Sequence, residues 1–78
     1  PDTELFVCIF SVVDRKSLQL MATQFIPELL HFGCANVPRL LIGTKTDLPN
    51  HQVSQKEAEE FAKLHKFIAY VPVSAIAN

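Results

Sequence analysis

Three short apolar runs, separated by two amphipathic segments, constrain the fold of this chain more than any other feature. In the first run, residues 4–13, hydrophobicity is continuous rather than alternating and β-branched and aromatic side chains are frequent, which is typical of a strand buried on both faces. The second run is Leu40-Leu41-Ile42, and the third covers residues 67–73. Strands that alternate with helices pair in parallel through right-handed crossovers. The sequence therefore predicts an α/β fold in the order strand, helix, strand, helix, strand.

The first amphipathic segment has the signals of a helix. Asp14 stands at the expected N-cap position, and Gly33 is expected to end the helix. Pro27 removes a backbone hydrogen bond to the carbonyl of Thr23, so we expect a kink or a local widening there. Apolar residues recur between these ends at spacings of three and four, which predicts one buried stripe. The stripe consists of Leu18, Met21, Phe25, Leu29 and Phe32.

The second amphipathic segment begins at a capping box, Ser54-Gln55-Lys56-Glu57, in which Ser54 and Glu57 can satisfy each other's free N–H groups. The residues expected to face inward are Ala58, Phe61, Ala62 and the neighbourhood of Leu64 and His65. Pro72 cannot donate to a sheet ladder, which predicts an edge position or a strand end.

Two successive crossovers of one hand, moving in one direction across a sheet, put both helices on the same face. The first two apolar runs nevertheless have apolar side chains on both sides. The sequence thus indicates a further helix layer that these 78 residues do not contain, and we interpret them as one part of a larger three-layer sandwich.

Composition excludes several classes of protein. The chain is 49% hydrophobic, and 7 basic residues nearly balance 8 acidic ones, which excludes global disorder and a general nucleic-acid binder. The longest apolar run, residues 5–10, is far below the ~18 residues that a membrane span needs. Cys8 and Cys34 lack the spacing of a zinc site. We interpret Cys8 as a small buried hydrophobe and Cys34 as a free thiol in a reducing compartment, and the sequence leaves a disulfide between them open.

The most informative polar stretch is Thr44-Lys45-Thr46-Asp47, which directly follows the second apolar run. Open α/β sheets bind ligands at the carboxyl ends of their strands. A carboxylate there can accept two parallel hydrogen bonds from guanine N1 and its 2-amino group, which adenine does not offer. Lys45 can lay its stem along the base. Backbone N–H groups at Ser74-Ala75, after the next strand, could donate to the guanine 6-oxygen.

These stretches resemble the C-terminal half of a Ras-superfamily small GTPase, most closely the Rho family, and the resemblance covers nearly all 78 residues. The matching stretches are Pro1-Asp2-Thr3, Phe10-Ser11-Val12-Val13, Ile26-Pro27-Glu28 with His31, Cys34-Ala35-Asn36-Val37-Pro38, Gly43-Thr44-Lys45-Thr46-Asp47-Leu48 and Ser74-Ala75. The resemblance implies a P-loop NTPase-like fold, with residues 1–78 forming the guanine-specificity half of the domain. One departure is the short path from Leu48 to Ser54, which leaves no room for the Rho insert helix.

The resemblance also implies roles for five residues in binding GTP or GDP. Asp47 would contact the guanine edge, Lys45 would stack on the base and Thr44 would tie neighbouring loops. Ser74 would orient Asp47, and Ala75 would contact the 6-oxygen through its backbone. No residue is expected to be catalytic or to bind metal, because the chain has no GxxxxGK[S/T] loop, switch threonine or DxxG motif.

The intact domain would accordingly hydrolyse GTP with Mg²⁺ as a signalling switch, whereas this part alone should not. Its expected partners are exchange factors, GTPase-activating proteins and effectors, and its expected location is the cytoplasm, with a lipidated tail outside these residues as a route to membranes. Two alternatives stay open. The chain could be a truncated or degenerate GTPase-like interaction module that binds no nucleotide. It could also be part of an unrelated doubly wound domain, such as a flavodoxin-like protein, with TKTD incidental.

Overall fold

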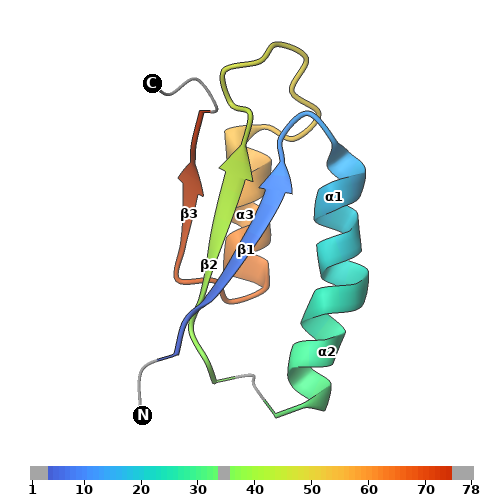
Figure 1. The fold of residues 1–78 in the computed structure, drawn as a ribbon, viewed down its shortest axis with the longest axis vertical. Coiled ribbons are helices and arrows are strands. Elements are labelled where there is room, and N and C mark those ends of the chain that lie inside the picture. The colour runs from blue at the N-terminus through green and yellow to red at the C-terminus, as the bar shows by residue number, and fades with distance from the viewer. Residues whose placement is uncertain (1–3, 34–35, 75–78) are drawn as a thin grey trace.

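The three apolar runs form one parallel sheet in the computed structural model, which describes residues 4–33 and 36–74. The strands lie in the order β1-β2-β3 (Figure 1). The elements along the chain are β1 (Phe6–Ser11), α1 (Arg15–Leu20), the π-helix η1 (Met21–Phe25), α2 (Ile26–His31), β2 (Arg39–Thr44), α3 (Gln55–Leu64) and β3 (Ala69–Pro72). The predicted α/β order is confirmed.

The register of the sheet separates a covered face from an open face. Cys8 pairs with Leu41 and Leu41 with Tyr70, and paired residues in neighbouring strands point to the same side. Leu41 is fully buried on that side. On the opposite side, Ile9 of β1 is 60% exposed and Val71 of β3 is 39% exposed. The first run is therefore not buried on both faces within these residues.

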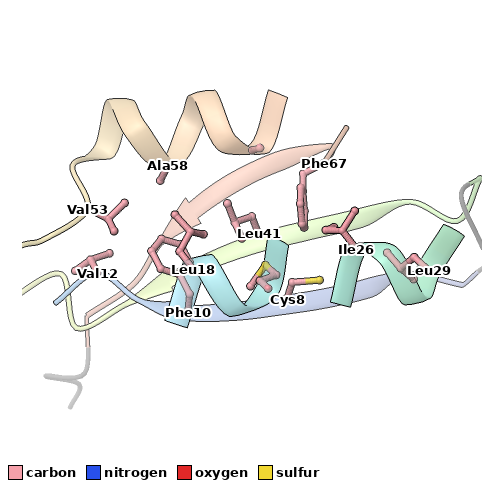
Figure 2. Packing of buried hydrophobic residues seen from close by; sticks show 12 residues of the cluster. Cys8, Phe10, Val12, Leu18, Ile26, Leu29, Leu41, Val53, Ala58 and Phe67 are labelled. Carbon is pink, nitrogen blue, oxygen red and sulfur yellow. The ribbon is translucent and has the colours of Figure 1, made fainter. Parts of the chain in front are cut away.

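One hydrophobic core occupies the covered face and draws on both helical segments (Figure 2). Leu18 from α1 and Ala58 from α3 belong to the same cluster as Phe10 and Leu41 from the strands. The core residues are Cys8, Phe10, Val12, Leu18, Met21, Ile26, Leu29, Leu41, Val53, Ala58, Ala62 and Phe67. The expected placement of both helices on one face is confirmed, and so is the burial of Cys8, which is a free thiol.

Residues 15–31 are helical throughout, with a local widening before Pro27. The Asp14 side chain accepts a hydrogen bond from the Lys16 N–H at 3.1 Å and caps the helix as predicted. The turn then widens over η1, where the Ile26 N–H bonds to the Met21 carbonyl. Gly33 follows the helix with a φ of +74°, a conformation that glycine adopts without strain. The predicted buried stripe is wrong at its last residue, because Phe32 is 73% exposed.

Ser54 caps helix α3, and its hydroxyl accepts from the Glu57 N–H at 3.1 Å, which confirms one half of the predicted capping box. The reciprocal half is not formed between these two described residues, and the Glu57 carboxylate pairs with the Arg15 guanidinium instead. Ala58 and Ala62 are buried as predicted, whereas the inward placement of Leu64 is wrong, since it is 73% exposed.

The carboxyl end of α3 is fixed by a buried arginine at the start of β2. Arg39 is 5% exposed, and its Nε and Nη2 donate to the His65 carbonyl at 3.0 and 2.8 Å. Its guanidinium also lies 5.7 Å from the centre of the Phe67 ring. The third strand is shorter than the predicted run, and Pro72 is its last residue on an outer strand, as expected. No helix in residues 4–33 and 36–74 combines the length and apolar character needed to cross a membrane.

Candidate nucleotide-binding site

All three parallel strands end at the same edge of the sheet, and the polar TKTD stretch lies there (Figure 1). Thr44, the last residue of β2, is bonded to the end of β1 in two ways. Its hydroxyl donates to the Phe10 carbonyl at 3.0 Å, and its own carbonyl accepts from the Val12 N–H at 3.1 Å. Thr44 thus holds the start of the β2 loop, residues 45–54, against the neighbouring strand.

Lys45 and Asp47 lie on a tight turn at the start of the β2 loop. Lys45 has a φ of +64°, and the Leu48 N–H donates to its carbonyl at 3.1 Å. A non-glycine residue in this region costs about 1–2 kcal/mol, so the surrounding contacts must hold it there. The side chains of both Lys45 and Asp47 are exposed. Both side chains therefore lie at the surface, at the carboxyl end of β2.

The end of β3 is hydrogen-bonded to this turn. The Val73 N–H donates to the Gly43 carbonyl at 2.8 Å, so the parallel ladder continues one residue past Pro72. The Val73 carbonyl in turn accepts from the Thr46 N–H at 3.2 Å and from the Thr46 hydroxyl at 2.8 Å. Ser74 follows directly and is exposed, whereas Ala75 lies outside the described residues. The structure therefore brings the neighbourhoods of Asp47 and Ser74 together at one edge.

The far side of the β2 loop is attached to the connection between β1 and α1. The N–H groups of Gln52 and Val53 donate to the Val12 carbonyl at 2.8 and 3.1 Å. The Arg15 N–H donates to Gln52 Oε1 at 2.8 Å, and its guanidinium donates to the Gln52 carbonyl. These contacts fix the loop at its base, and no local sequence pattern predicts them.

His51 contacts another residue of the β2 loop. Its Nε2 lies 3.0 Å from the Thr46 carbonyl, within hydrogen-bonding distance. A cleft of about 360 Å³ lies beside this contact, and Tyr70 forms part of its wall. Burial, and secondarily the charge of Glu59, raises the pKa of Tyr70 above its usual value, so its hydroxyl stays neutral at physiological pH. The sequence had suggested no role for His51.

Lys45 and Asp47 supply charged side chains at this end of the sheet. Within residues 4–33 and 36–74, no three His, Cys, Asp or Glu side chains gather into a possible metal site. A carboxylate and the aliphatic stem of a lysine are groups that can meet the edge and the face of a planar base.

A comparison with family models agrees with this geometry. The model of the Ras family matches residues 1–78, the whole sequence. The chain belongs to the Ras family. This Ras-family chain thus has the α/β architecture of part of a P-loop small GTPase, and the unrelated doubly wound alternative is excluded. Membership of this family supports a nucleotide-binding switch of the small GTPase type in general.

Proposed function

We propose that this Ras-family chain supplies guanine recognition to a GTP/GDP switch. The observation that supports the proposal most is the pair of hydrogen bonds from Thr46 to the Val73 carbonyl, because it holds the β2 loop beside the segment that begins at Ser74. A guanine lying at this edge would meet a carboxylate on one side and backbone N–H groups on the other. That combination accepts guanine and leaves polar groups unpaired against adenine.

Each predicted residue has one part in this recognition. Asp47 accepts the guanine N1–H and 2-amino N–H, and Lys45 lies along the face of the base. Thr44 holds the loop to β1 through its bond to the Phe10 carbonyl. Ser74 orients Asp47, and the backbone N–H of Ala75 donates to the 6-oxygen. The base would thus meet one charged acceptor, the Asp47 carboxylate, and one donor, the Ala75 N–H, which matches the guanine pattern.

Hydrolysis belongs to the intact domain in this proposal. Phosphoryl transfer needs groups that position the γ-phosphate and Mg²⁺, and the sequence has neither a phosphate loop nor a DxxG motif. Residues 1–78 would accordingly bind the base without cleaving GTP. Exchange factors, GTPase-activating proteins and effectors are the partners of such a switch.

The Rho family is the proposed subfamily. Thr44 occupies the first position of the motif, as in Rho proteins, and the flanking Gly43 and Leu48 also match. The path from the end of β2 to the start of α3 has no helix in the structure, so this chain lacks the Rho insert.

The open face of the sheet supports the proposal that residues 1–78 are one part of a larger domain. Val7 and Ile9 on β1 are 50% and 60% exposed, and Val71 on β3 is 39% exposed. An apolar sheet face of this kind is stable in water only when another layer covers it. The same face would suit the alternative, an interaction module without nucleotide, and nucleotide binding separates the two.

Competition between base analogues tests the proposal. In the complete protein we expect GDP to bind about 10⁴-fold more tightly than ADP, since a site built for one hydrogen-bonding pattern rejects another by this order. Inosine diphosphate lacks only the 2-amino group and should bind about 10–100-fold more weakly than GDP, because one bond to a carboxylate is lost. Equal affinities for GDP and ADP would refute guanine recognition and favour the interaction module.

A further inference from the structure

The Val73 carbonyl accepts two hydrogen bonds from a single residue, Thr46. The Thr46 N–H lies 3.2 Å away and the Thr46 hydroxyl lies 2.8 Å away. The shorter of the two bonds is therefore the one made by the side chain. The motif itself leaves the third position of TKxD unspecified, so nothing in it requires a hydroxyl there.

The places of these two residues in the chain give the contact its importance. Thr46 immediately precedes Asp47, and Val73 immediately precedes Ser74. The bond thus joins the residue next to Asp47, which would accept from the base, to the residue next to Ser74, which would orient Asp47. Thr46 is partly buried, and its carbonyl lies 3.0 Å from His51 Nε2, within hydrogen-bonding distance.

We propose that Thr46 is a positioning residue that fixes the distance between the β2 loop and the segment following β3, and thereby sets the selectivity for guanine. This inference rests on the proposed function. A base is selected only if its two edges are met at once, and binding groups must be held within about 0.5 Å of their working geometry. With the hydroxyl removed, Thr46 keeps only its N–H bond of 3.2 Å to the Val73 carbonyl. The segments then separate more easily, and the polar pattern that excludes adenine is relaxed.

The test compares Thr46→Val, which has nearly the same shape but no hydroxyl, with Thr46→Ser, which keeps the hydroxyl. Affinities for GDP and ADP are measured by competition in the complete protein, and the urea midpoint is measured alongside. For Thr46→Val we expect GDP binding to weaken about three- to tenfold, and the GDP-to-ADP affinity ratio to fall by a similar factor. Thr46→Ser should restore both to within about twofold of the unaltered protein.

A matched control makes the same chemical change elsewhere. Thr23 donates its hydroxyl to the Gln19 carbonyl at 3.1 Å within the helical segment, away from the sheet edge. Thr23→Val should leave the GDP-to-ADP ratio unchanged. If Thr46→Val does not fold, Thr46→Ala takes its place, because it removes the same hydroxyl without a β-branched side chain.

The outcomes separate the inference from the proposed function. A lower urea midpoint for Thr46→Val with an unchanged GDP-to-ADP ratio means that Thr46 has only a structural role, which overturns the inference and leaves guanine recognition intact. An unaltered protein that shows no preference for GDP overturns both. A reduced ratio that the serine variant restores supports the inference.

Discussion

Gly43→Ala should destabilise the protein, because the side chain of Tyr70 occupies the space that a Cβ at this position needs. Gly43 is buried in β2, directly before Thr44. A Cβ at this position would lie 2.3 Å from the Tyr70 hydroxyl oxygen, 2.9 Å from Cε1 and 3.0 Å from Cζ. Two ring carbons and the hydroxyl oxygen of one side chain are too close, so the whole ring must move. Phe10 packs against that ring at a centroid distance of 6.1 Å and restricts the movement.

The expected loss follows from two opposing terms. Overpacking a core costs about 1–3 kcal/mol. Replacing glycine by alanine within a strand contributes about 0.5–1 kcal/mol in the opposite direction, because the unfolded chain loses less freedom. The steric term is the larger, since ring carbons as well as the hydroxyl are displaced. We expect Gly43→Ala to lower the free energy of unfolding by about 1–2 kcal/mol.

Urea unfolding of the complete protein measures this loss, and Tyr70→Phe provides the internal control. Phenylalanine removes the closest contact and keeps the two ring carbons, so the cost of Gly43→Ala should fall by about 0.5–1 kcal/mol in that background. A Gly43→Ala protein as stable as its parent would refute the steric argument. The steric argument would also be refuted if Gly43→Ala lowered the free energy of unfolding equally in the Tyr70 and Tyr70→Phe proteins.

Two further predictions concern titratable groups whose pKa values are shifted by burial. Burial, and secondarily the charge of Arg39, lowers the pKa of His65 below its ordinary value of 6.5. The stability that the neutral imidazole allows is present above that value and is lost as the pH falls. Between about pH 7 and about pH 5, His65→Asn should therefore lose less unfolding free energy than the unaltered protein, and equal losses would contradict the assignment. Burial raises the pKa of Cys8 above 9.0, and the Cys8 side chain is only 6% exposed. Iodoacetamide should therefore label Cys8 slowly in the native protein and quickly in urea, which mass spectrometry can map to this residue. Equal rates in the two conditions would show that Cys8 is not buried.

Local signals predicted most of the fold because their causes are local. Asp14 and Ser54 cap their helices through hydrogen bonds that span two and three residues. Gly33 ends the first helical segment with a positive φ, and the widening before Pro27 follows from the missing N–H of proline. Each of these features depends only on residues within one or two turns.

The errors occurred where exposure depends on distant elements. Phe32 and Leu64 continue the apolar periodicity of their helices, yet each is 73% exposed, which the periodicity of a single helix cannot predict. Ile9 is as apolar as its neighbour Cys8, but the two point to opposite faces, and the helices of these residues cover only one. Periodicity predicts which face of a helix or strand is apolar, but it does not predict how much of that face other elements bury.

The candidate site was predicted through its motif, but the contacts that shape it were not. The bond from Thr46 to Val73 joins residues 27 positions apart and depends on the pairing of Gly43 with Pro72. The attachment of Gln52 to Arg15 likewise spans 37 positions. Such contacts depend on the register of the sheet, which no short stretch of the sequence specifies.

Guanine recognition by Asp47 is the central claim, and the most direct measurement is the affinity of Asp47→Asn for GDP and for xanthosine diphosphate. An amide offers a donor to the 2-oxygen of xanthine and can no longer accept two bonds from guanine. We expect GDP binding to weaken by about 100-fold or more and xanthosine diphosphate binding to improve by a comparable factor. Glu60→Gln, the same change on the exposed side of α3, should alter neither affinity. An Asp47→Asn protein that keeps the base preference of its parent would contradict the account.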